Sequence, residues 1–319
     1  MPLIDKPLAE LKTYLGRNPR PGDFDSYWER ALAELDATDP EVELRPSEFQ
    51  VPGAECFHLF FTGVGGARVH AKYLRPSRSE GSHPAVLQFH GYSYHSGDWS
   101  DKLNYVSLGF SVAALDCRGQ GGWSEDVGGV RGNTLHGHII RGLDDHQDRL
   151  LFRQIYLDTA MLARIVIDLP EVDGERVGVT GGSQGGGLTL ACASLEPRLK
   201  RAAAVFPFLC DFQRVWEMDL VMTAYAELKT FFRHFDPRHE REEEIFTRLG
   251  YIDCQHLAPR IRSEVLFATG LMDETCPAST QFSAYNRITS PKSMIIYPDF
   301  GHEGLPDMND SIFTFMSDL

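Results

Sequence analysis

The chain has 319 residues, of which 42% are hydrophobic and 24% charged. This composition is typical of a globular protein and excludes a collagen-like, coiled-coil or largely disordered chain. The 45 acidic residues outnumber the 31 basic ones, which gives a formal net charge of −14. Because like charges repel, this charge disfavours binding to nucleic acid or to an anionic membrane surface.

The cysteines and the N-terminus indicate the compartment. Scattered cysteines without a C-x-x-C pair are predicted to be reduced, buried side chains. The first dozen residues include the charged Asp5, Lys6, Glu10 and Lys12, and they lack the apolar core of a signal peptide. We therefore expect a cytoplasmic protein. The six cysteines are Cys56, Cys117, Cys192, Cys210, Cys254 and Cys276.

Residues 1–50 are predicted to form a polar N-terminal extension. Apolar residues at helical spacing follow Asp23 up to Leu35, so Asp23 is expected to cap a helix there. Two β-rich runs, ECFHLFFTG and ARVHAKYLRP, come next and are divided by glycines. They predict antiparallel edge strands.

From residue 85 the pattern alternates between apolar strands and helices. This alternation predicts an α/β fold whose mostly parallel central sheet has helices on both faces. Residues 1–319 are expected to form one domain, with a helical insertion at about 211–250. Within it the charged run RHFDPRHEREEE is expected to be a solvated helix face. The predicted strands are Ala85–His90, Phe110–Asp116, Arg176–Thr180, Ala202–Phe206, Val265–Gly270 and Ser293–Tyr297, and a helix is expected over Leu151–Leu169.

The strongest chemical motif is G-x-S-x-G around Ser183. It lies directly after a predicted strand and before a predicted helix. A serine on such a sharp turn adopts strained backbone angles that expose its hydroxyl, and the flanking glycines allow neighbouring backbone to approach closely. The alternatives are an ordinary glycine-rich turn or a nucleotide-binding loop, but the placement favours a nucleophile.

A serine nucleophile needs a base that is held by an acid. Asp273 and His302 each follow a later predicted strand, in the order serine, acid, histidine that is typical of α/β-hydrolases. Asp299 and Glu274 are weaker candidates for the acid. These positions predict a catalytic triad of Ser183, Asp273 and His302.

Acyl transfer also requires N–H donors for the oxyanion. The expected donors are the backbone N–H groups of Gln184, which follows the nucleophile, and Tyr92, where Gly91 would permit the turn. The pair His136 and His138 could ligate a metal, but no third ligand accompanies it. We therefore expect neither a metal nor an organic cofactor.

In this order, the motifs FHGYSYHSGDW, Arg118-Gly119-Gln120, GVTGGSQGGG, GLMDETCP and FGHEG resemble those of carbohydrate esterase family seven. This is the acetyl xylan esterase / cephalosporin C deacetylase family of the α/β-hydrolase superfamily. The likeness extends over nearly the whole chain. It implies a cytoplasmic serine esterase that removes acetyl groups from small sugars, such as xylo-oligosaccharides, and from cephalosporin C.

The resemblance also implies a hexamer whose enclosed active sites exclude polymers. It assigns Ser183, Asp273 and His302 as the triad, Tyr92 and Gln184 as oxyanion donors, and Arg118 and Gln120 as structural supports. Phe206, Pro207 and Phe208 stand in a segment where relatives often have tyrosines, and they are expected to line the substrate pocket. Trp99, Trp123 and Trp216 could offer stacking faces for sugars, but packing in the core or at an interface is the favoured alternative for each.

Two alternative functions remain open. The first keeps the triad but acts on other substrates, either as a broad short-chain carboxylesterase or as a prolyl-oligopeptidase-like peptidase. The second is an inactive hydrolase fold that serves as a binding module. Inactive members usually lack a residue of the triad, whereas all three residue types are present here.

Overall fold

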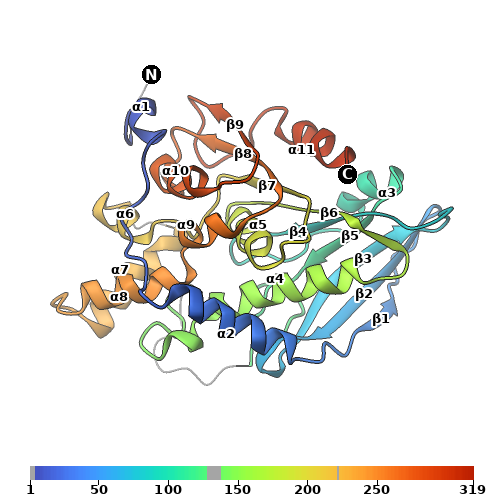
Figure 1. Ribbon diagram of the computed structural model, residues 1–319, viewed down its shortest axis with the longest axis horizontal. Coiled ribbons are helices and arrows are strands. Elements are labelled where there is room, and N and C mark those ends of the chain that lie inside the picture. Colours follow the sequence, from blue (N-terminus) through green and yellow to red (C-terminus); the bar gives the residue numbers. More distant parts are fainter. Residues whose placement is uncertain (1–3, 128–137, 221–222) are drawn as a thin grey trace.

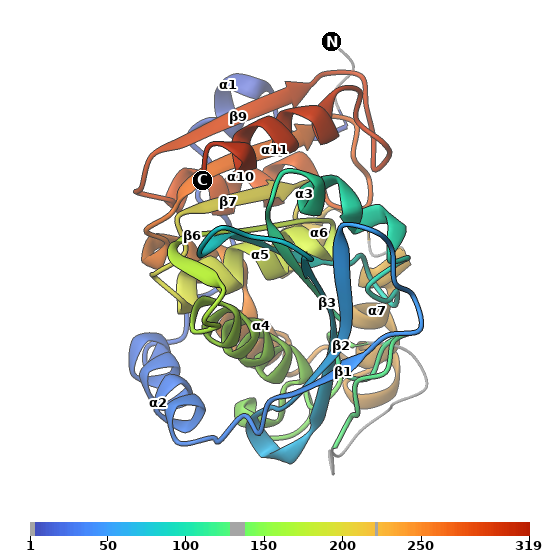
Figure 2. The same cartoon turned by 90° about the vertical axis from the view of Figure 1, so that its right-hand side faces the viewer.

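The computed structural model describes residues 4–127, 138–220 and 223–319. Its centre is a nine-stranded sheet with the strand order β1-β2-β3-β5-β4-β6-β7-β8-β9. Figure 2 shows β1 and β9 at opposite ends of this sheet. The strands are β1 (Glu43–Pro46), β2 (Ala54–Thr62), β3 (Arg68–Pro76), β4 (His83–Phe89), β5 (Ser111–Leu115), β6 (Val172–Gly182), β7 (Arg201–Val205), β8 (Glu264–Gly270) and β9 (Lys292–Tyr297).

Strands β4 to β9 form the parallel part of the sheet. All pairs among these six strands are parallel, and β6 lies between β4 and β7. Every residue of β5 is buried, as expected for a strand that is covered on both faces. The predicted mostly parallel sheet is therefore confirmed, and the predicted strands agree with the observed ones to within a few residues.

The first three strands form the antiparallel part. The runs predicted as antiparallel strands are β2 and β3, which pair along their whole length. They are not edge strands, because β1 covers β2 and β3 pairs with β5. Strand β1 lies inside the predicted polar extension, and its four residues are too few for a clear alternating pattern.

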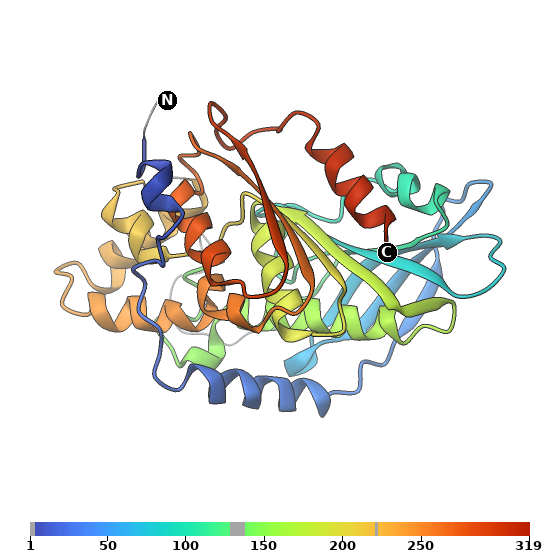
Figure 3. The ribbon, with the colours of Figure 1, turned by 45° about the horizontal axis from the view of Figure 1, so that its top comes forward.

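Helices cover both faces of the sheet. In Figure 3, α4 and α2 lie below the strands while α3 and α11 lie above them. The helices are α1 (Leu8–Leu11), α2 (Phe24–Asp36), α3 (Leu103–Ser107), α4 (Leu151–Ile167), α5 (Gln184–Leu195), α6 (Phe212–Glu217), α7 (Ala226–Phe235), α8 (Glu242–Leu249), α9 (Cys254–Leu257), α10 (Ala278–Arg287) and α11 (Met308–Ser317). Single 3₁₀ turns occur at Val64–Gly66, Ser100–Lys102, Gln147–Arg149, Thr223–Tyr225, Gly250–Ile252 and Ala258–Arg260.

Helix α2 forms where the apolar spacing predicts it, and its inner side is buried. Asp23 occupies the N-cap position, but its side chain makes no capping hydrogen bond. Its carboxylate instead accepts a hydrogen bond from the Tyr251 hydroxyl and pairs with Arg30. The expected capping by this side chain is therefore wrong, because a tertiary contact competes for the same carboxylate.

The segment between β7 and β8 is helical and contains α6 to α9. Helices α6, α7 and α8 gather at one side of the molecule, beyond the strands (Figure 1). The charged run at residues 233–244 is not one helix face. It covers the end of α7, a turn and the start of α8, and Asp236 in the turn accepts hydrogen bonds from the N–H groups of Glu240 and Arg241.

Two further expectations concern the interior and the membrane. All six cysteines are buried and free, as predicted. Among the residues that the structure describes, no helix is long and apolar enough to cross a membrane.

Candidate active site

Ser183 lies on the sharp turn between β6 and α5. This turn, residues 181–185, is called the elbow below. Its backbone has φ 57° and ψ −120°, a region that residues other than glycine rarely adopt. A Cβ on Gly185 would lie 2.1 Å from the carbonyl oxygen of Phe89, and one on Gly181 would lie 2.6 Å from the backbone of Gly185. The predicted strained turn and close backbone approach are therefore both present.

The structure brings the three distant polar residues into one line. The Ser183 hydroxyl lies 2.9 Å from Nε2 of His302, and Nδ1 of the same ring lies 2.8 Å from Oδ2 of Asp273. Asp273 follows β8 and His302 follows β9, and these parallel strands end at the same edge of the sheet. The carboxylate that reaches His302 is that of Asp273, rather than that of Asp299 or Glu274.

Local hydrogen bonds orient the acid. Asp273 is fully buried, and its Oδ1 accepts hydrogen bonds from the backbone N–H groups of Thr275 at 2.9 Å and Cys276 at 2.7 Å. This leaves Oδ2 to accept the Nδ1–H of His302. With the proton held on Nδ1, Nε2 carries a lone pair that can accept the proton of the Ser183 hydroxyl.

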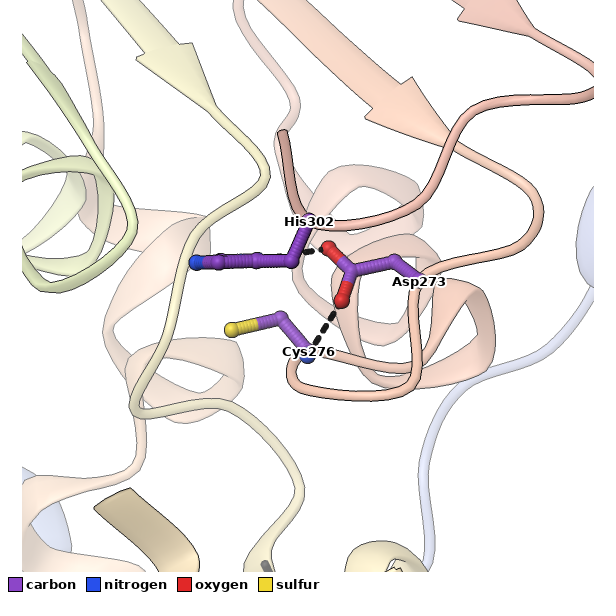
Figure 4. Close-up of side chains that lie close together, drawn as sticks. All are labelled: Asp273, Cys276 and His302. Atoms are coloured by element: carbon purple, nitrogen blue, oxygen red, sulfur yellow. Dashed lines mark hydrogen bonds and ion pairs between the residues drawn. The ribbon is translucent and has the colours of Figure 1, made fainter. Parts of the chain in front are cut away.

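Cys276 is the residue at this site that the sequence analysis missed. Figure 4 shows its sulfur beside the His302 ring, pointing the same way. Burial, and then the charge of Asp273, raise the pKa of the thiol well above its usual value, although its hydrogen bond with Ser183 opposes them. Its position three residues after the acid was the signal in the sequence, but cysteine alone does not reveal which residue it will face.

The side chains of Asp273, Cys276 and His302 have potential ligand atoms within 4.8 Å of one another, which is a spacing that can hold a metal ion. Both nitrogens of His302 are already engaged, by Ser183 and by Asp273. The hydrogen bonds thus account for this cluster without a metal. Of the pair considered earlier, His136 lies outside the described residues, and His138 bonds to Ser93 at 3.1 Å.

The expected oxyanion donors lie at the ends of β6 and β4. Gln184 is the first residue of α5, so its N–H has no acceptor within the helix. In the part of the chain that the structure describes, neither this N–H nor that of Tyr92 donates a hydrogen bond. The proposed reason for the turn is wrong, because Gly91 does not have positive φ and a Cβ there would meet no atom, whereas Ser93 has φ 61°.

Gln120 and Arg118, the two predicted structural supports, act at different places. The Gln120 side chain bonds to that of Gln184 at 2.8 Å and accepts the N–H of Ser93 at 2.9 Å, so it ties the two donor segments together. Arg118 is 1% exposed and forms a two-point ion pair with Asp158, at 2.6 and 2.5 Å. Gln120 therefore lies beside the elbow, whereas Arg118 acts from the core.

The three residues that were expected to line the substrate pocket lie in different surroundings. Phe206 packs against the His302 ring at 4.6 Å, and with Gly182 it lines a cavity of about 570 Å³. Pro207 packs closely against the helix backbone near Gly186. Phe208 is 1% exposed and packs in the core.

The three tryptophans that could offer stacking faces also lie in different surroundings. Trp216 packs against Phe232 at 4.6 Å, which fits a packing role. Trp99 and Trp123 instead line a second pocket together.

A model of the acetyl xylan esterase (AXE1) family matches residues 1–319. The chain belongs to this family. Acetyl xylan esterase 1 from Thermoanaerobacterium sp. JW/SL YS485 is 60% identical and superposes with a TM-score of 0.97, covering 98% of this chain and 99% of that one. The acetyl xylan esterase from Paenibacillus sp. R4 is 35% identical, with a TM-score of 0.93 and the same coverage.

The family confirms the resemblance that the motifs indicated. Among curated proteins, the chain is 28% identical over 295 residues to the acetyl esterase Axe7A of Xylanibacter ruminicola, which covers 90% of this chain. The chain spans 64% of the length of that esterase. Solved hydrolases at 15–16% identity, such as an acylaminoacyl peptidase from Pyrococcus horikoshii with a TM-score of 0.56, share the α/β-hydrolase fold.

Proposed function

We propose that this protein is a serine esterase that hydrolyses acetyl esters of small acetylated sugars, such as xylo-oligosaccharides, through an acetyl-enzyme intermediate. The observation that carries the proposal is the hydrogen-bonded line from Ser183 through His302 to Asp273, in a chain that belongs to the acetyl xylan esterase family. In this proposal Ser183 is the nucleophile, His302 the base and Asp273 the residue that orients the base.

The first half of the reaction forms the acetyl-enzyme. Nε2 of His302 takes the proton of Ser183 while the serine oxygen attacks the acetyl carbonyl carbon. The carbonyl oxygen becomes negative and is stabilised by the N–H groups of Tyr92 and Gln184, of which one such donor contributes about 3–4 kcal/mol. His302 then gives its proton to the departing sugar oxygen.

The second half hydrolyses the intermediate by the same groups. Water replaces the sugar, His302 takes one of its protons, and the hydroxide oxygen attacks the acetyl carbonyl carbon. The tetrahedral intermediate then collapses, the bond to the Ser183 oxygen breaks, and His302 returns the proton to that oxygen. Each proton passes through Nε2, so a single imidazole held by Asp273 is sufficient for both halves.

The substrate proposal has two finer parts. Cephalosporin C is included because its acetoxymethyl group presents the same acetyl ester on a small leaving group. The enzyme is further proposed to be a hexamer with enclosed sites, so that acetylated oligosaccharides react and polymeric acetylxylan does not. Sedimentation of the purified protein tests the assembly independently of the chemistry.

The decisive experiment labels the nucleophile. A serine-directed fluorophosphonate should label the wild-type protein at Ser183 and should not label Ser183→Ala, which should also lose at least about 10³-fold in kcat. Ser194→Ala is the matched control, since Ser194 lies near the far end of α5, the helix that follows Ser183, and its hydroxyl donates a hydrogen bond to the carbonyl oxygen of Leu190. An unlabelled wild-type protein would support the inactive binding module instead.

A substrate series then tests the specificity. Initial rates on acetylated xylo-oligosaccharides, cephalosporin C, polymeric acetylxylan, p-nitrophenyl esters of increasing acyl length and peptide amides distinguish the candidates. We expect the small acetyl esters to react and the amides not to. Rapid amide cleavage without sugar deacetylation would support the peptidase, and equal rates on long acyl esters would support a broad carboxylesterase.

A further inference from the structure

A second pocket of about 450 Å³ lies beside the candidate active site, and the proposed chemistry does not use it. Trp99 and Trp123 form part of its wall, together with His58 and His70 from the antiparallel strands β2 and β3. Lys72 and Glu48 also line it. The pocket thus combines two indoles with several hydrogen-bonding groups.

The histidines of this pocket form a hydrogen-bonded relay. Oδ2 of Asp116 lies 2.6 Å from Nδ1 of His70, and Nε2 of His70 lies 2.9 Å from Nδ1 of His58. Burial acts to raise the pKa of Asp116, but hydrogen bonds from His70 and from the backbone N–H groups of Trp123 and Ser96 outweigh it and keep the pKa well below its usual value. Asp116 is therefore an anion.

This anion determines where the protons of both rings lie. In the neutral form of His70, whose Nδ1–H is donated to Asp116, Nε2 is an acceptor, and His58 then donates its own Nδ1–H to it. Nε2 of His58 is then left with a lone pair. Burial, and next the nearby His70, lower the pKa of His58, which keeps that ring neutral. Among the described residues, Nε2 has one charged group within 4 Å, the exposed carboxylate of Glu48 at 3.9 Å.

The indole of Trp123 packs against this ring and is largely exposed. The Trp123 and His58 rings are stacked, with centroids 4.5 Å apart and an angle of 15° between them. Trp123 is nevertheless 62% exposed, so part of its indole is accessible to a ligand. Trp99 meets the edge of His58 at 5.2 Å, so both indoles border the same acceptor.

The second pocket adjoins the cavity beside the triad. Both are lined by His95, Ser96 and the segment that follows, so they are neighbours separated by one stretch of chain. Trp123 also stands three residues after Gln120, whose side chain bonds to Gln184 of the elbow. Three residues span at most about 10 Å, so the indole lies within a few sugar rings of the elbow.

We propose that this pocket is a saccharide subsite, in which a sugar ring of a neutral oligosaccharide packs against the exposed part of the Trp123 indole and a hydroxyl group of the same oligosaccharide donates a hydrogen bond to Nε2 of His58. The proposal rests on the proposed esterase function, because the bound ring belongs to the same oligosaccharide as the acetylated unit at Ser183. The carboxylates of Glu48 and Asp116 disfavour an anionic ligand. The ammonium group of Lys72 is already engaged by the carbonyl oxygen of Gly97 and by the Trp99 ring.

Direct binding tests the subsite separately from the esterase chemistry. Unacetylated xylotriose is titrated by calorimetry into Ser183→Ala protein, which cannot hydrolyse any ester in the proposed mechanism. We expect saturable binding, at least a tenfold weaker Kd when Trp123→Ala is added, and weaker binding with His58→Phe, which keeps the ring stacking but removes the acceptor. Unfolding curves establish that each variant is folded, and binding that is absent, or unaffected by Trp123→Ala, overturns the proposal.

The matched control is Tyr94→Ala. Tyr94 is another exposed aromatic residue, 67% exposed, whose backbone oxygen accepts the N–H of Gly121 but whose side chain does not line the pocket. We expect its Kd for xylotriose to match that of the parent. An equal loss of affinity in this variant would overturn the subsite in favour of non-specific aromatic contact.

In enzymes that retain Ser183, Trp123→Ala should lower the ratio of kcat/KM on acetylated xylotriose to kcat/KM on p-nitrophenyl acetate about tenfold, and an unchanged ratio would refute the link to the esterase site. If neither ester is hydrolysed, the proposed function fails, while the calorimetry still decides whether the pocket binds sugar.

Discussion

The ion pair between Arg118 and Asp158 should be the most costly single contact to break outside the active site. The guanidinium of Arg118 forms two hydrogen bonds to the carboxylate and a third to the carbonyl oxygen of Val64 at 3.2 Å. Both side chains are almost completely buried, at 2% and 1% exposure. Replacing Arg118 by methionine would leave a buried carboxylate without its counter-charge.

The size of the effect follows from this burial. Removing one partner of a buried ion pair costs about 3–5 kcal/mol of unfolding free energy, because the remaining charge loses its compensation. The unfolding entropy of a chain of this length is about 0.7 kcal/mol per kelvin, so Arg118→Met should lower the Tm by about 4–8 °C. Replacing both residues, with Asp158→Leu added, removes the uncompensated charge and should recover half of the loss or more.

Calorimetric unfolding of the two single variants and the double variant measures this coupling. Arg45→Met is the matched control, because Arg45 makes the same two-point contact with Glu43, at 2.7 and 2.8 Å, on the exposed surface. There solvent screens the charges, so we expect a Tm change within about 1 °C. If Arg118→Met were as harmless as Arg45→Met, or if the double variant were less stable than both single variants, burial would not be the reason for the cost.

Three further predictions concern the elbow, a buried carboxyl group and the thiols. Gly185→Ala places a Cβ 2.1 Å from the oxygen of Phe89 and should reduce kcat at least about 100-fold and lower the Tm, whereas Gly81→Ala, where a Cβ meets nothing within 4 Å, should change neither. Burial raises the pKa of Glu227 to about 8, although its carboxylate accepts the N–H groups of Ile139 and Ile140. The pKa of Glu227 is higher in the folded protein than in the unfolded chain, so its contribution to stability should be complete below about pH 4.5 and lost as the pH rises through 8. The Tm of the wild type should therefore fall relative to that of Glu227→Gln over this range. Parallel curves of Tm against pH for the two proteins would contradict this prediction. All six buried thiols should resist dithiobisnitrobenzoate in the native protein and react in urea, and rapid native reaction of any would show that burial does not protect it.

The strands and helices that the sequence predicts correctly have a clear local signal. Strands β4 to β9 are short apolar runs with helical segments between them, and α2 has an apolar stripe on one side. The errors occur where the outcome depends on distant partners. Strand β1 exists because β2 offers it a free edge, and the Asp23 carboxylate faces Tyr251 instead of its own helix.

The same distinction applies to the candidate site. The motif around Ser183 indicates an exposed hydroxyl because its glycines and flanking elements are contiguous in the chain. The position of Asp273 after a strand favours it as the acid of the triad. Its 2.8 Å contact with His302, however, depends on how two loops fold. No local pattern connects Cys276 with Ser183, or His58 with His70 and Asp116, so these contacts were not predicted.

By itself, the sequence determined the α/β alternation, the elbow and the order of the candidate triad, because each is written in neighbouring residues and in the periodicity of apolar side chains. Only the tertiary structure decided which carboxylate holds His302, which phenylalanine lies against it, and that two indoles border a histidine relay. These contacts join residues from 12 to 96 positions apart, since His58 meets His70 and Phe206 meets His302. Their distances are set by strand register and loop conformation, which the packing of the whole chain determines.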